Sequence, residues 1–456
     1  MNFKNKIIFI IFIIVVIFYF IKNYFKFELL NVLILKRGLL APNKLWYNIS
    51  DLLLDDPSGI NFYNNIKKEG EFIKKNMFGT EIIIVTNIKY IKIILNNSPN
   101  IFSVGNLKKQ FFKSFMEKNV GVSKGCPWKQ RRKLNEHVLT SDKLHIYSEK
   151  YNNYIENVIN DYKNNNLIFE NFNDIGKNIV TKIIFNKYKI HDDIFNIFSE
   201  ANSIYATTSD NFKINEKIYN NYKKILFENI KTPEKHSFFD LSVEYQQKIK
   251  CNKNYEKNYE IFHQIPHFIF PLIGLFITTI PRLLMILTNH KKIFTEVINE
   301  INSIKDKVNV SKQIYELKIL RKCVLEMLRL NNPVTTTFRT LEKDFIFDKK
   351  YKFKKNTQFL ILNNPVLRDT NFFKNPNKFN PYRWNKNMEE SYYSLSFNQG
   401  PQKCPGKELS IFLIQSFIYN IVKIKKINVD SIKSNKINTN YIPQIINPFN
   451  IEFEFK

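Results

Sequence analysis

The stretch that decides the fold is Phe397-Asn-Gln-Gly400-Pro-Gln-Lys-Cys404-Pro405-Gly406, which leads into the long apolar run ELSIFLIQSFIYNIVKI. It places one cysteine in a tight Gly/Pro loop just before a predicted helix. Pro405 suits the first turn of that helix, and a helix N-terminus is expected to lower the pKa of the adjacent thiol. A lone thiolate there is a candidate nucleophile or a single axial metal ligand, although a lone cysteine before a helix is more often an inert core residue.

Two further motifs lie upstream of this loop. In Glu326-Met-Leu-Arg329 the charged residues share one helix face at i and i+3, which taken alone is typical of a surface ion pair. Trp128 and Arg132, at i and i+4, direct an indole N–H and a guanidinium the same way, an arrangement that suits a carboxylate. Only nine of the 69 basic residues are arginine, so an arginine marks a place where lysine will not serve.

Together these motifs resemble the cytochrome P450 family. Phe-x-x-Gly-x-x-x-Cys-x-Gly is the spacing of that family's haem-binding loop, and the chain matches its four fixed positions, Phe397, Gly400, Cys404 and Gly406. The resemblance covers about residues 40–456. It implies a mainly α fold with a small β-rich region, and haem b with Cys404 as the axial iron ligand.

The resemblance also implies roles for other residues. It gives a triad that supports the haem loop, formed by Glu326, Arg329 and Arg383. It gives three residues that hold the haem propionates: Trp128, Arg132 and Arg339. Arg368-Asp369 fills the family's usual Arg-Asp position, and Thr278 keeps the position of the alcohol that helps to pass protons to oxygen.

The predicted oxygen-activating segment, Gly274-Leu-Phe-Ile-Thr-Thr279, departs from the family pattern. Ile277 stands where an acid is usual, and Leu275 replaces a glycine. Pro281 removes a helical hydrogen bond to the Ile277 carbonyl and predicts a kink. In the haem loop, Gln402 replaces an arginine, which predicts weaker haem binding.

A membrane anchor is predicted at residues 1–27, followed by a single catalytic domain at 28–456. Ile7 to Ile21 is an unbroken run of fifteen apolar or aromatic residues flanked by lysines. No small-residue cleavage site follows, which favours an anchor over a cleaved signal peptide. The excess of basic residues after the run places the catalytic domain in the cytoplasm, as in a single-pass protein of the endoplasmic reticulum. Prolines are expected to interrupt the other long apolar segment, 261–288.

Composition and residue spacing argue against several other classes of protein. The net charge of +28 invites a nucleic-acid interpretation, but lysine and asparagine are spread along the whole chain and no nucleic-acid partner is predicted. Four scattered cysteines do not make a disulfide scaffold or a zinc site. His263 and His267 are spaced for a metal, but Pro266 lies between them and no third ligand follows.

The coarse pattern predicts where the secondary structure lies. EIIIVTN at 81–87 predicts a strand, and IKYIKIILNN predicts a helix directly after it. Residues 140–325 are expected to be mostly helical, and short extended pieces such as 357–363 follow residue 330. A last helix is expected after Pro405.

The expected activity is insertion of one oxygen atom from O₂ into an apolar substrate, with electrons from NADPH through cytochrome P450 reductase. A basic cluster is expected to dock that flavoprotein: Lys129, Arg131, Lys133, Lys403 and Lys407. Two alternatives stay open. One is a hydroperoxide isomerase or dehydratase that needs no reductase, and the other is a catalytically impaired or non-enzymatic protein of the same fold.

Overall fold

The structure is a computed structural model that describes residues 60–455, except 78–79, 106–108, 110–111, 113–114, 141–145, 188–191, 202–212, 249–256, 305–307 and 439–445. Residues 13, 44, 45 and 48 are also described. The predicted anchor, 1–27, therefore lies outside the described residues but for Ile13.

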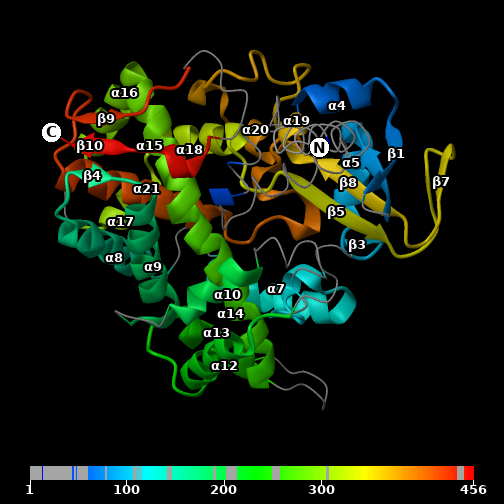
Figure 1. Cartoon of the computed structure of the whole chain (residues 1–456), viewed down its shortest axis with the longest axis horizontal. Coiled ribbons are helices and arrows are strands. Elements are labelled where there is room, and N and C mark those ends of the chain that lie inside the picture. The colour runs from blue at the N-terminus through cyan, green and yellow to red at the C-terminus, as the bar shows by residue number, and fades with distance from the viewer. Residues whose placement is uncertain are drawn as a thin grey trace, which may run out of the picture.

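Helices make up most of the described chain, as the sequence predicts (Figure 1). The α-helices are α4 (Ile60–Lys67), α5 (Ile88–Asn96), α7 (Gly125–Leu139), α8 (Ser148–Asp161), α9 (Phe169–Phe185), α10 (Asp193–Ala201), α12 (Glu216–Lys231), α13 (Phe238–Lys248), α14 (Lys257–Gly274), α15 (Ile280–Asn289), α16 (Lys291–Asn302), α17 (Val310–Tyr315), α18 (Lys318–Leu330), α19 (Asn363–Leu367), α20 (Lys386–Glu390) and α21 (Lys407–Ile424). A π-helical turn, η2, spans Leu275–Thr279. Short 3₁₀ turns are η1 (Val120–Val122), η3 (Pro381–Arg383), η4 (Leu395–Phe397), η5 (Gly400–Gln402) and η6 (Pro448–Asn450).

Three small sheets accompany the helices. The largest has five strands in the order β1 (Phe72–Met77), β2 (Thr80–Val85), β8 (Gln358–Leu362), β5 (Thr336–Leu341) and β3 (Phe102–Val104). Only the β2–β8 pair in it is parallel, with Ile83 opposite Phe359. The others are β4 (Asn166–Leu167), β10 (Phe453–Phe455) and β9 (Ile432–Ser434), and the hairpin β6 (Phe345–Phe347) and β7 (Tyr351–Phe353).

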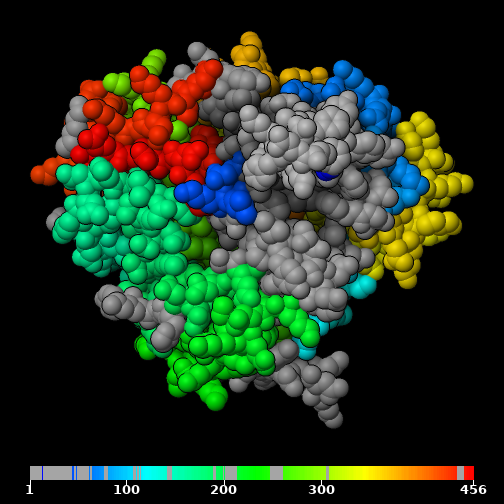
Figure 2. All heavy atoms as spheres, viewed as in Figure 1, coloured from blue at the N-terminus to red at the C-terminus, as the bar shows by residue number. Residues whose placement is uncertain are grey.

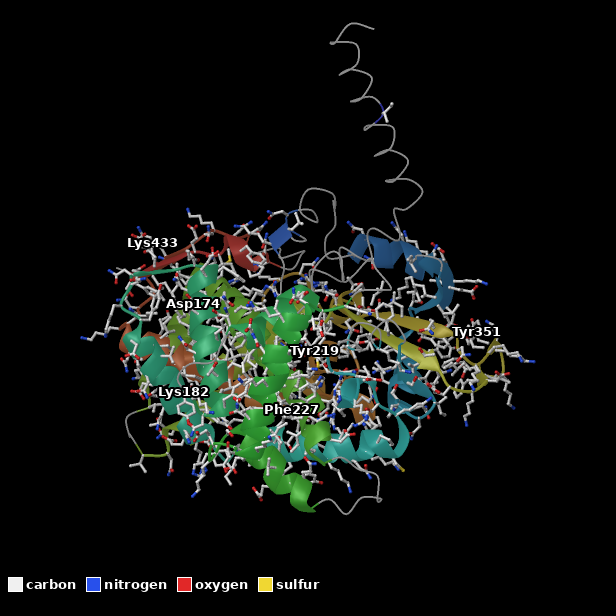
Figure 3. All side chains as sticks on the ribbon, turned by 60° about the horizontal axis from the view of Figure 1, so that its bottom comes forward. Asp174, Lys182, Tyr219, Phe227, Tyr351 and Lys433 are labelled. Atoms are coloured by element: carbon white, nitrogen blue, oxygen red, sulfur yellow. The ribbon has the colours of Figure 1, made fainter. Side chains whose placement is uncertain are left out.

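The sheet and the helical part occupy different sides of the molecule. Figure 1 shows the five-stranded sheet beside α4 and α5, and most of the long helices on the other side. Figure 3 places Tyr351 of the β6–β7 hairpin far from Asp174 and Lys182 of α9. In Figure 2 the C-terminal segment lies against the chain that contains β4, where Phe453 of β10 pairs with Leu167.

The main core forms around one long central helix, Glu260–Asn289, which comprises α14 from Glu260 onward, η2 and α15. Among the described residues it is the one helix long and apolar enough to cross a membrane, but 94% of its most apolar window is buried inside the protein. The prediction that prolines would interrupt this segment is wrong. Pro266 and Pro271 lie inside α14, where burial on several sides maintains the helix although each proline removes one backbone donor.

Several predictions of single strands and helices from the local sequence pattern are confirmed. The strand-rich stretch 81–87 forms β2 and α5 follows it at Ile88, where the Asn87 side chain caps the helix. The extended segment 357–363 contains β8, and α21 begins at Lys407 just after Pro405. Alternation and apolar periodicity are local signals, and here they agree with the tertiary packing.

Candidate functional site

The Cys404 loop is closed by its own backbone. The Cys404 N–H donates to the Phe397 carbonyl at 2.8 Å, and the Lys403 N–H donates to that of Gly400 at 3.0 Å. The Phe397 ring packs on the main core, which anchors the start of this turn. The thiol therefore sits on a short closed turn directly before α21.

Glycine is required at position 400 for two reasons. Its φ is +74°, in the left-handed region that favours glycine. A Cβ there would also lie 2.6 Å from the Leu95 carbonyl oxygen at the end of α5. At Gly406, in contrast, a Cβ would meet only Leu139 and Ser410 atoms at 3.8 Å and beyond. No described protein atom therefore excludes a side chain at position 406.

Burial raises the pKa of the Cys404 thiol above its ordinary value. The Gly406 N–H and the charges of Arg132 and Lys407 act in the opposite direction but do not outweigh it. The expectation of a lowered thiol pKa is therefore wrong for the protein alone, because the sequence shows the helix N-terminus but not the desolvation. A metal ion deprotonates a coordinating thiol outright, so this shift does not prevent ligation.

Glu326 is the centre of a buried ionic cluster. Both Glu326 and Arg329 have fully buried side chains, and two parallel hydrogen bonds of 2.9 Å join them. Arg383 Nε adds a third at 3.1 Å to Oε1. Burial acts to raise the pKa of Glu326, but the charge and hydrogen bonds of Arg329, followed by the charge of Arg383, lower it overall. The surface ion pair considered for this motif is excluded by its burial.

Two more donors to Glu326 were missed from the sequence. The Trp384 indole N–H donates to Oε2 at 2.9 Å, and the Asn380 backbone N–H donates to Oε1 at 3.0 Å. Trp384 is 2% exposed. Its position directly after Arg383 was the only signal in the sequence, and nothing local shows where its N–H points.

The arginines of this region hold the backbone of the segments around the cluster. Arg329 Nη1 donates to the Leu367 carbonyl at 2.9 Å, and Arg383 Nη1 donates to the Lys374 carbonyl at 2.9 Å. Arg368 Nη2 donates to the Leu330 carbonyl at 2.6 Å. The planar fork of the guanidinium explains why lysine does not replace these residues in a lysine-rich chain.

Arg339 is a buried cation. It is 6% exposed, and burial lowers its pKa to about 10. It donates to Ser98 Oγ at 2.9 Å and to the Phe338 carbonyl at 2.8 Å, both of them neutral acceptors. In the described part of the chain no carboxylate forms an ion pair with it.

Trp128 and Arg132 lie on α7, and Arg132 contacts the Cys404 loop. Arg132 Nη1 donates to the Lys403 carbonyl at 2.7 Å, and its Nε pairs with Glu136 at 2.6 Å. The Trp128 indole is half-buried, and its N–H donates to none of the described residues. The buried guanidinium of Arg339, which has no carboxylate partner among the described residues, the Trp128 indole N–H and the Cys404 thiol fit a prosthetic group that carries an iron and carboxylates.

The segment predicted to activate oxygen contains the π-helical turn η2. Thr278 is fully buried, and its hydroxyl donates to the Gly274 carbonyl at 2.6 Å. The Ile280 N–H bonds to the Leu275 carbonyl, five residues back, which is the register of a π turn. The turn ends at Thr279, two positions before Pro281, where a kink was predicted, and such turns are a recognised cause of helix kinks. Ile277 is buried and η2 contains no acid.

The predicted basic docking cluster is only partly a set of unpaired cations. Arg131 forms a bidentate pair with Glu260, at 2.7 and 2.9 Å. Lys407 pairs with Glu389 at 2.8 Å. Lys129, Lys133 and Lys403 are exposed. Arg131 is thus part of the contact between α7 and α14 rather than a free surface charge.

A second ionic network, at the two ends of the Cys404 loop, was also missed. Arg321 of α18 binds both Glu389 of α20 and Glu408 of α21. These partners lie 68 and 87 positions away in the chain, so no local motif shows them. The only signal was that Arg321 is one of the few arginines outside the matched motifs.

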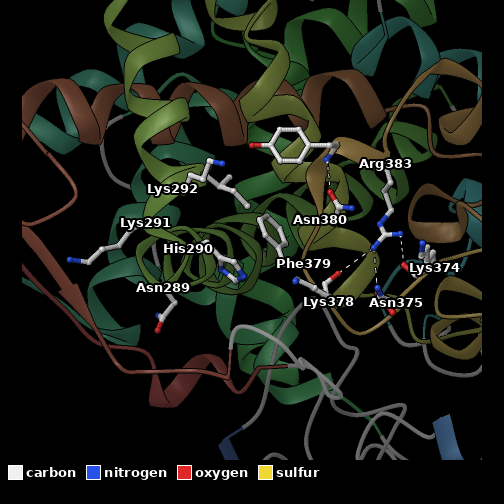
Figure 4. Close-up of a pocket in the computed structure, with 12 residues that line it drawn as sticks. Asn289, His290, Lys291, Lys292, Lys374, Asn375, Lys378, Phe379, Asn380 and Arg383 are labelled. Carbon is white, nitrogen blue, oxygen red and sulfur yellow. Dashed lines mark hydrogen bonds between the residues drawn. The ribbon is translucent and has the colours of Figure 1, made fainter.

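Two other features lie outside this site. The described residues contain no group of three or more metal-binding side chains, and burial lowers the pKa of His263 to about 4. A surface cavity of about 810 Å³ is lined by residues 289–293 and by part of the segment 374–383. Figure 4 shows Arg383 at one side of this cavity, with its hydrogen bonds to backbone carbonyls. Cys404 does not line it.

Comparison with known proteins shows which family the chain resembles. The family model described as Cytochrome P450 matches residues 213–448, a little over half of the chain. Among curated proteins, Cytochrome P450 85A2 of Arabidopsis thaliana is 26% identical over 46% of this chain and 47% of its own length. The mitochondrial cholesterol side-chain cleavage enzyme of Rattus norvegicus is 28% identical over 27% of this chain and 24% of its own length. The matches thus span less than half of these relatives.

A solved structure matches a larger share of the chain. The retinoic-acid-bound cyanobacterial CYP120A1 superposes with a TM-score of 0.68, covering 87% of this chain and 94% of that one at 16% identity. At this identity the likeness concerns the fold alone.

Proposed function

Because the chain belongs to the cytochrome P450 family, we propose that it is a haem-thiolate monooxygenase. It inserts one oxygen atom from O₂ into an apolar substrate of lipid, sterol or xenobiotic-like character. Proteins of this family use haem b with a cysteine thiolate as the axial ligand. The observation that carries the proposal is the Cys404 loop, which is closed on Phe397 and placed directly before α21.

The residues of the proposed haem site divide into three groups. Cys404 ligates the iron, and Phe397, Gly400 and Gly406 shape its loop. The propionates bind three donors: Trp128, Arg132 and Arg339. Arg339 supports this assignment most directly, because a buried guanidinium held only by neutral acceptors gains most from an incoming carboxylate. The triad of Glu326, Arg329 and Arg383 fixes the segments that surround the loop.

When bound, the haem supplies the redox-active iron for O₂ chemistry, and the thiolate ligand favours O–O cleavage. The protein supplies proton handling and exclusion of water. The Thr278 hydroxyl is the proposed proton-relay group, and it holds its own proton on the Gly274 carbonyl. The buried apolar side chains of α14 and η2, such as Phe270 and Phe276, keep bulk water out.

The substrate class is supported by two kinds of observation. The core beside Thr278 is apolar, so a substrate there would be held by burial of apolar surface. Relatives include proteins named sterol 26-hydroxylase (Homo sapiens) and cholesterol side-chain cleavage enzyme. The segments 95–115 and 190–260 are the proposed substrate-contacting regions.

For location and partners, we propose a catalytic domain at 28–456 that faces the cytoplasm from the endoplasmic reticulum, anchored in the bilayer by residues 1–27. NADPH-cytochrome P450 reductase is the proposed electron donor. Four of the relatives are named as mitochondrial, which makes a mitochondrial location the competing possibility. Imaging of the tagged full chain against markers of both membranes distinguishes the two.

The test of the proposed function is the absorption spectrum of the purified, dithionite-reduced protein under carbon monoxide. A strongly red-shifted Soret band that Cys404→Ala abolishes is the expected result. A haem spectrum without that shift, or a folded protein that binds no supplied haem, contradicts the proposal. NADPH-driven oxidation in the presence of the reductase then tests the reaction itself.

One observation favours a second function within the same fold. A hydroperoxide isomerase or dehydratase needs neither a reductase nor a proton-relay acid, and η2 has Ile277 at the position of that acid. Turnover of lipid hydroperoxides without NADPH, at a rate above that of NADPH-driven oxidation, would identify this function.

A further inference from the structure

Arg321 binds residues at both ends of the loop that carries Cys404. The loop runs from the end of α20 to the start of α21. On the α20 side, Arg321 Nη2 donates to Glu389 Oε2 at 2.9 Å. On the α21 side, Nη1 and Nη2 donate to the two oxygens of Glu408 at 2.7 and 3.0 Å. One planar cation on α18 thus joins the two helices between which the loop is suspended.

Two more residues complete this network. Lys407 Nζ donates to Glu389 at 2.8 Å, and the Tyr315 hydroxyl donates to Glu408 at 2.8 Å. Two cations and two carboxylates therefore balance one another. Burial acts to raise the pKa of Glu389 and of Glu408, but the hydrogen bonds from Arg321 lower both overall. The side chains of Arg321 and Glu389 are 22% and 17% exposed, so solvent screens their pairing less than it screens a surface ion pair.

Inside the loop, polar contacts transmit the position of its ends to the thiol. The Gln399 side-chain amide donates to the carbonyls of Glu389, Ser391 and Ser394 at 3.3, 3.1 and 3.2 Å. The chain then turns back so that the Cys404 N–H meets the Phe397 carbonyl. Only three residues separate Cys404 from Glu408, so a shift of α21 relative to α20 displaces the thiol with it.

Lysine is not equivalent to arginine at this position. A guanidinium presents several N–H donors in a fixed plane, so it can bind two carboxylates at once with defined geometry. A lysine ammonium is a flexible point charge that retains the attraction but not the geometry. Arg321→Lys therefore removes the geometric constraint and keeps the net charge of the network.

We propose that Arg321 is a positioning residue, which holds Cys404 Sγ where it can ligate the haem iron by fixing Glu389 and Glu408 relative to each other. This inference rests on the proposed function, because ligation presupposes a bound haem. Among the described residues, the polar partners of the Arg321 side chain are Glu389 and Glu408, not the thiol or the proposed haem contacts. It acts on the loop, as residues around a metal site orient the ligands.

The first test compares two conservative variants of the haem-loaded full chain. Arg321→Lys is the test variant. Arg131→Lys is the matched control, because Arg131 forms a similarly buried bidentate pair with Glu260 between α7 and α14. The readout is the fraction of reduced, CO-bound haem that shows the red-shifted Soret band of thiolate ligation. Arg321→Lys should lower that fraction, or the haem affinity, by about tenfold, and Arg131→Lys should not.

An equal loss in both variants, or no loss in Arg321→Lys, overturns the proposal. If Arg321→Lys does not fold, Glu408→Gln is measured in its place. It removes the charge at one end of the network but leaves the pair of Arg321 with Glu389, and a loss in the same direction is expected. A red-shifted Soret fraction and a haem affinity in Glu408→Gln equal to those of the Arg131→Lys control would also overturn the proposal.

The second test needs no haem, so it separates this inference from the proposed function. Hydrogen exchange of the apoprotein should be faster at the amides of residues 391–406 in Arg321→Lys than in wild type and in Arg131→Lys. If exchange in that loop is the same in Arg321→Lys as in wild type, the proposed role of Arg321 is contradicted whatever the spectrum shows. A wild-type protein without a thiolate spectrum contradicts the proposed function, while the exchange result still decides whether Arg321 orders the loop.

Discussion

Trp384 and Arg329 donate to the same oxygen of Glu326. The indole Nε1 lies 2.9 Å from Glu326 Oε2, and Arg329 Nε lies 2.9 Å from it as well. A fully buried carboxylate is thus satisfied by donors from α18 and from the segment around η3. This shared acceptor ties the position of the η3 segment to α18.

Trp384→Phe is expected to destabilise the protein by about 1–3 kcal/mol, because it removes a hydrogen bond to a buried charged acceptor. Urea unfolding of the full chain measures the change. Tyr382→Phe is the control within the same segment, since the Tyr382 hydroxyl bonds to Glu296 near the surface. We expect a change within about 0.5 kcal/mol for that control. Equal effects of the two variants would contradict the role given to the indole N–H.

Arg339→Met should have opposite effects on the apoprotein and on haem binding. The apoprotein should be as stable as wild type or more so, because a buried charge without a carboxylate partner is removed. Haem affinity should fall, because a charge-assisted contact to a propionate is lost. Urea unfolding without haem and a haem titration measure the two effects. If apoprotein stability and haem affinity both fell, Arg339 would instead be a residue that stabilises the packing of the protein itself.

Gly400→Ala and Gly406→Ala form a matched pair. Gly400→Ala places a Cβ 2.6 Å from the Leu95 carbonyl oxygen at a φ of +74°, so the apoprotein should lose about 1–3 kcal/mol of stability. Gly406→Ala has room among the protein atoms, so the apoprotein should stay near wild type while haem binding weakens. Thermal unfolding of both apoproteins and a haem titration of Gly406→Ala provide the comparison. An unchanged haem affinity in Gly406→Ala would remove position 406 from the proposed contacts.

Ile277→Asp should raise NADPH-driven turnover and reduce release of peroxide, because it restores an acid beside Thr278. Ile277→Leu, which keeps the site apolar, is the control and should behave as wild type. Product formed per NADPH consumed is the measurement. No change in either quantity with a folded, haem-loaded Ile277→Asp protein would show that proton delivery follows another route.

Acid should weaken the Arg321 network. The pKa of Glu389 and of Glu408 lies below the ordinary value of 4.5 in the folded protein. Their contribution to stability is therefore present above that value and is lost as the pH falls through the lowered folded-state values. The free-energy difference between wild type and Glu389→Gln/Glu408→Gln should shrink as the pH falls from neutrality to below 4.5, as followed by urea unfolding. A difference independent of pH would show that the carboxylate charges do not stabilise the fold.

The parts of the site that could be predicted from the sequence are motifs whose residues lie a few positions apart. The turn from Phe397 to Gly406 and the i, i+3 pair of Glu326 and Arg329 are local, and a helix follows the cysteine as expected. Arg383 could be joined to them only through the resemblance to a family. Its distance of 57 positions from Glu326 carries no local signal.

What could not be predicted depends on burial and on contacts between distant segments. The carboxylates that bind Arg321 are distant from it in the sequence, and the direction of the Trp384 N–H is set by tertiary packing. The sign of the Cys404 pKa shift was wrong because desolvation is a property of the folded surroundings. The long central helix was expected to be interrupted, since propensity rules do not include the tertiary packing that holds Pro266 and Pro271 inside α14.

The parallel pairing of β2 with β8 has a consequence for how the chain reaches its folded state. Ile82–Ile84 pair with Gln358–Leu360, so most of the chain must be synthesised before this part of the sheet can form. Contacts so distant in sequence make folding slow, and until β8 arrives the β1–β2 hairpin presents an open edge to other chains. The nascent protein thus passes through a long interval in which aggregation competes with folding, and chaperones that shield strand edges should raise its yield.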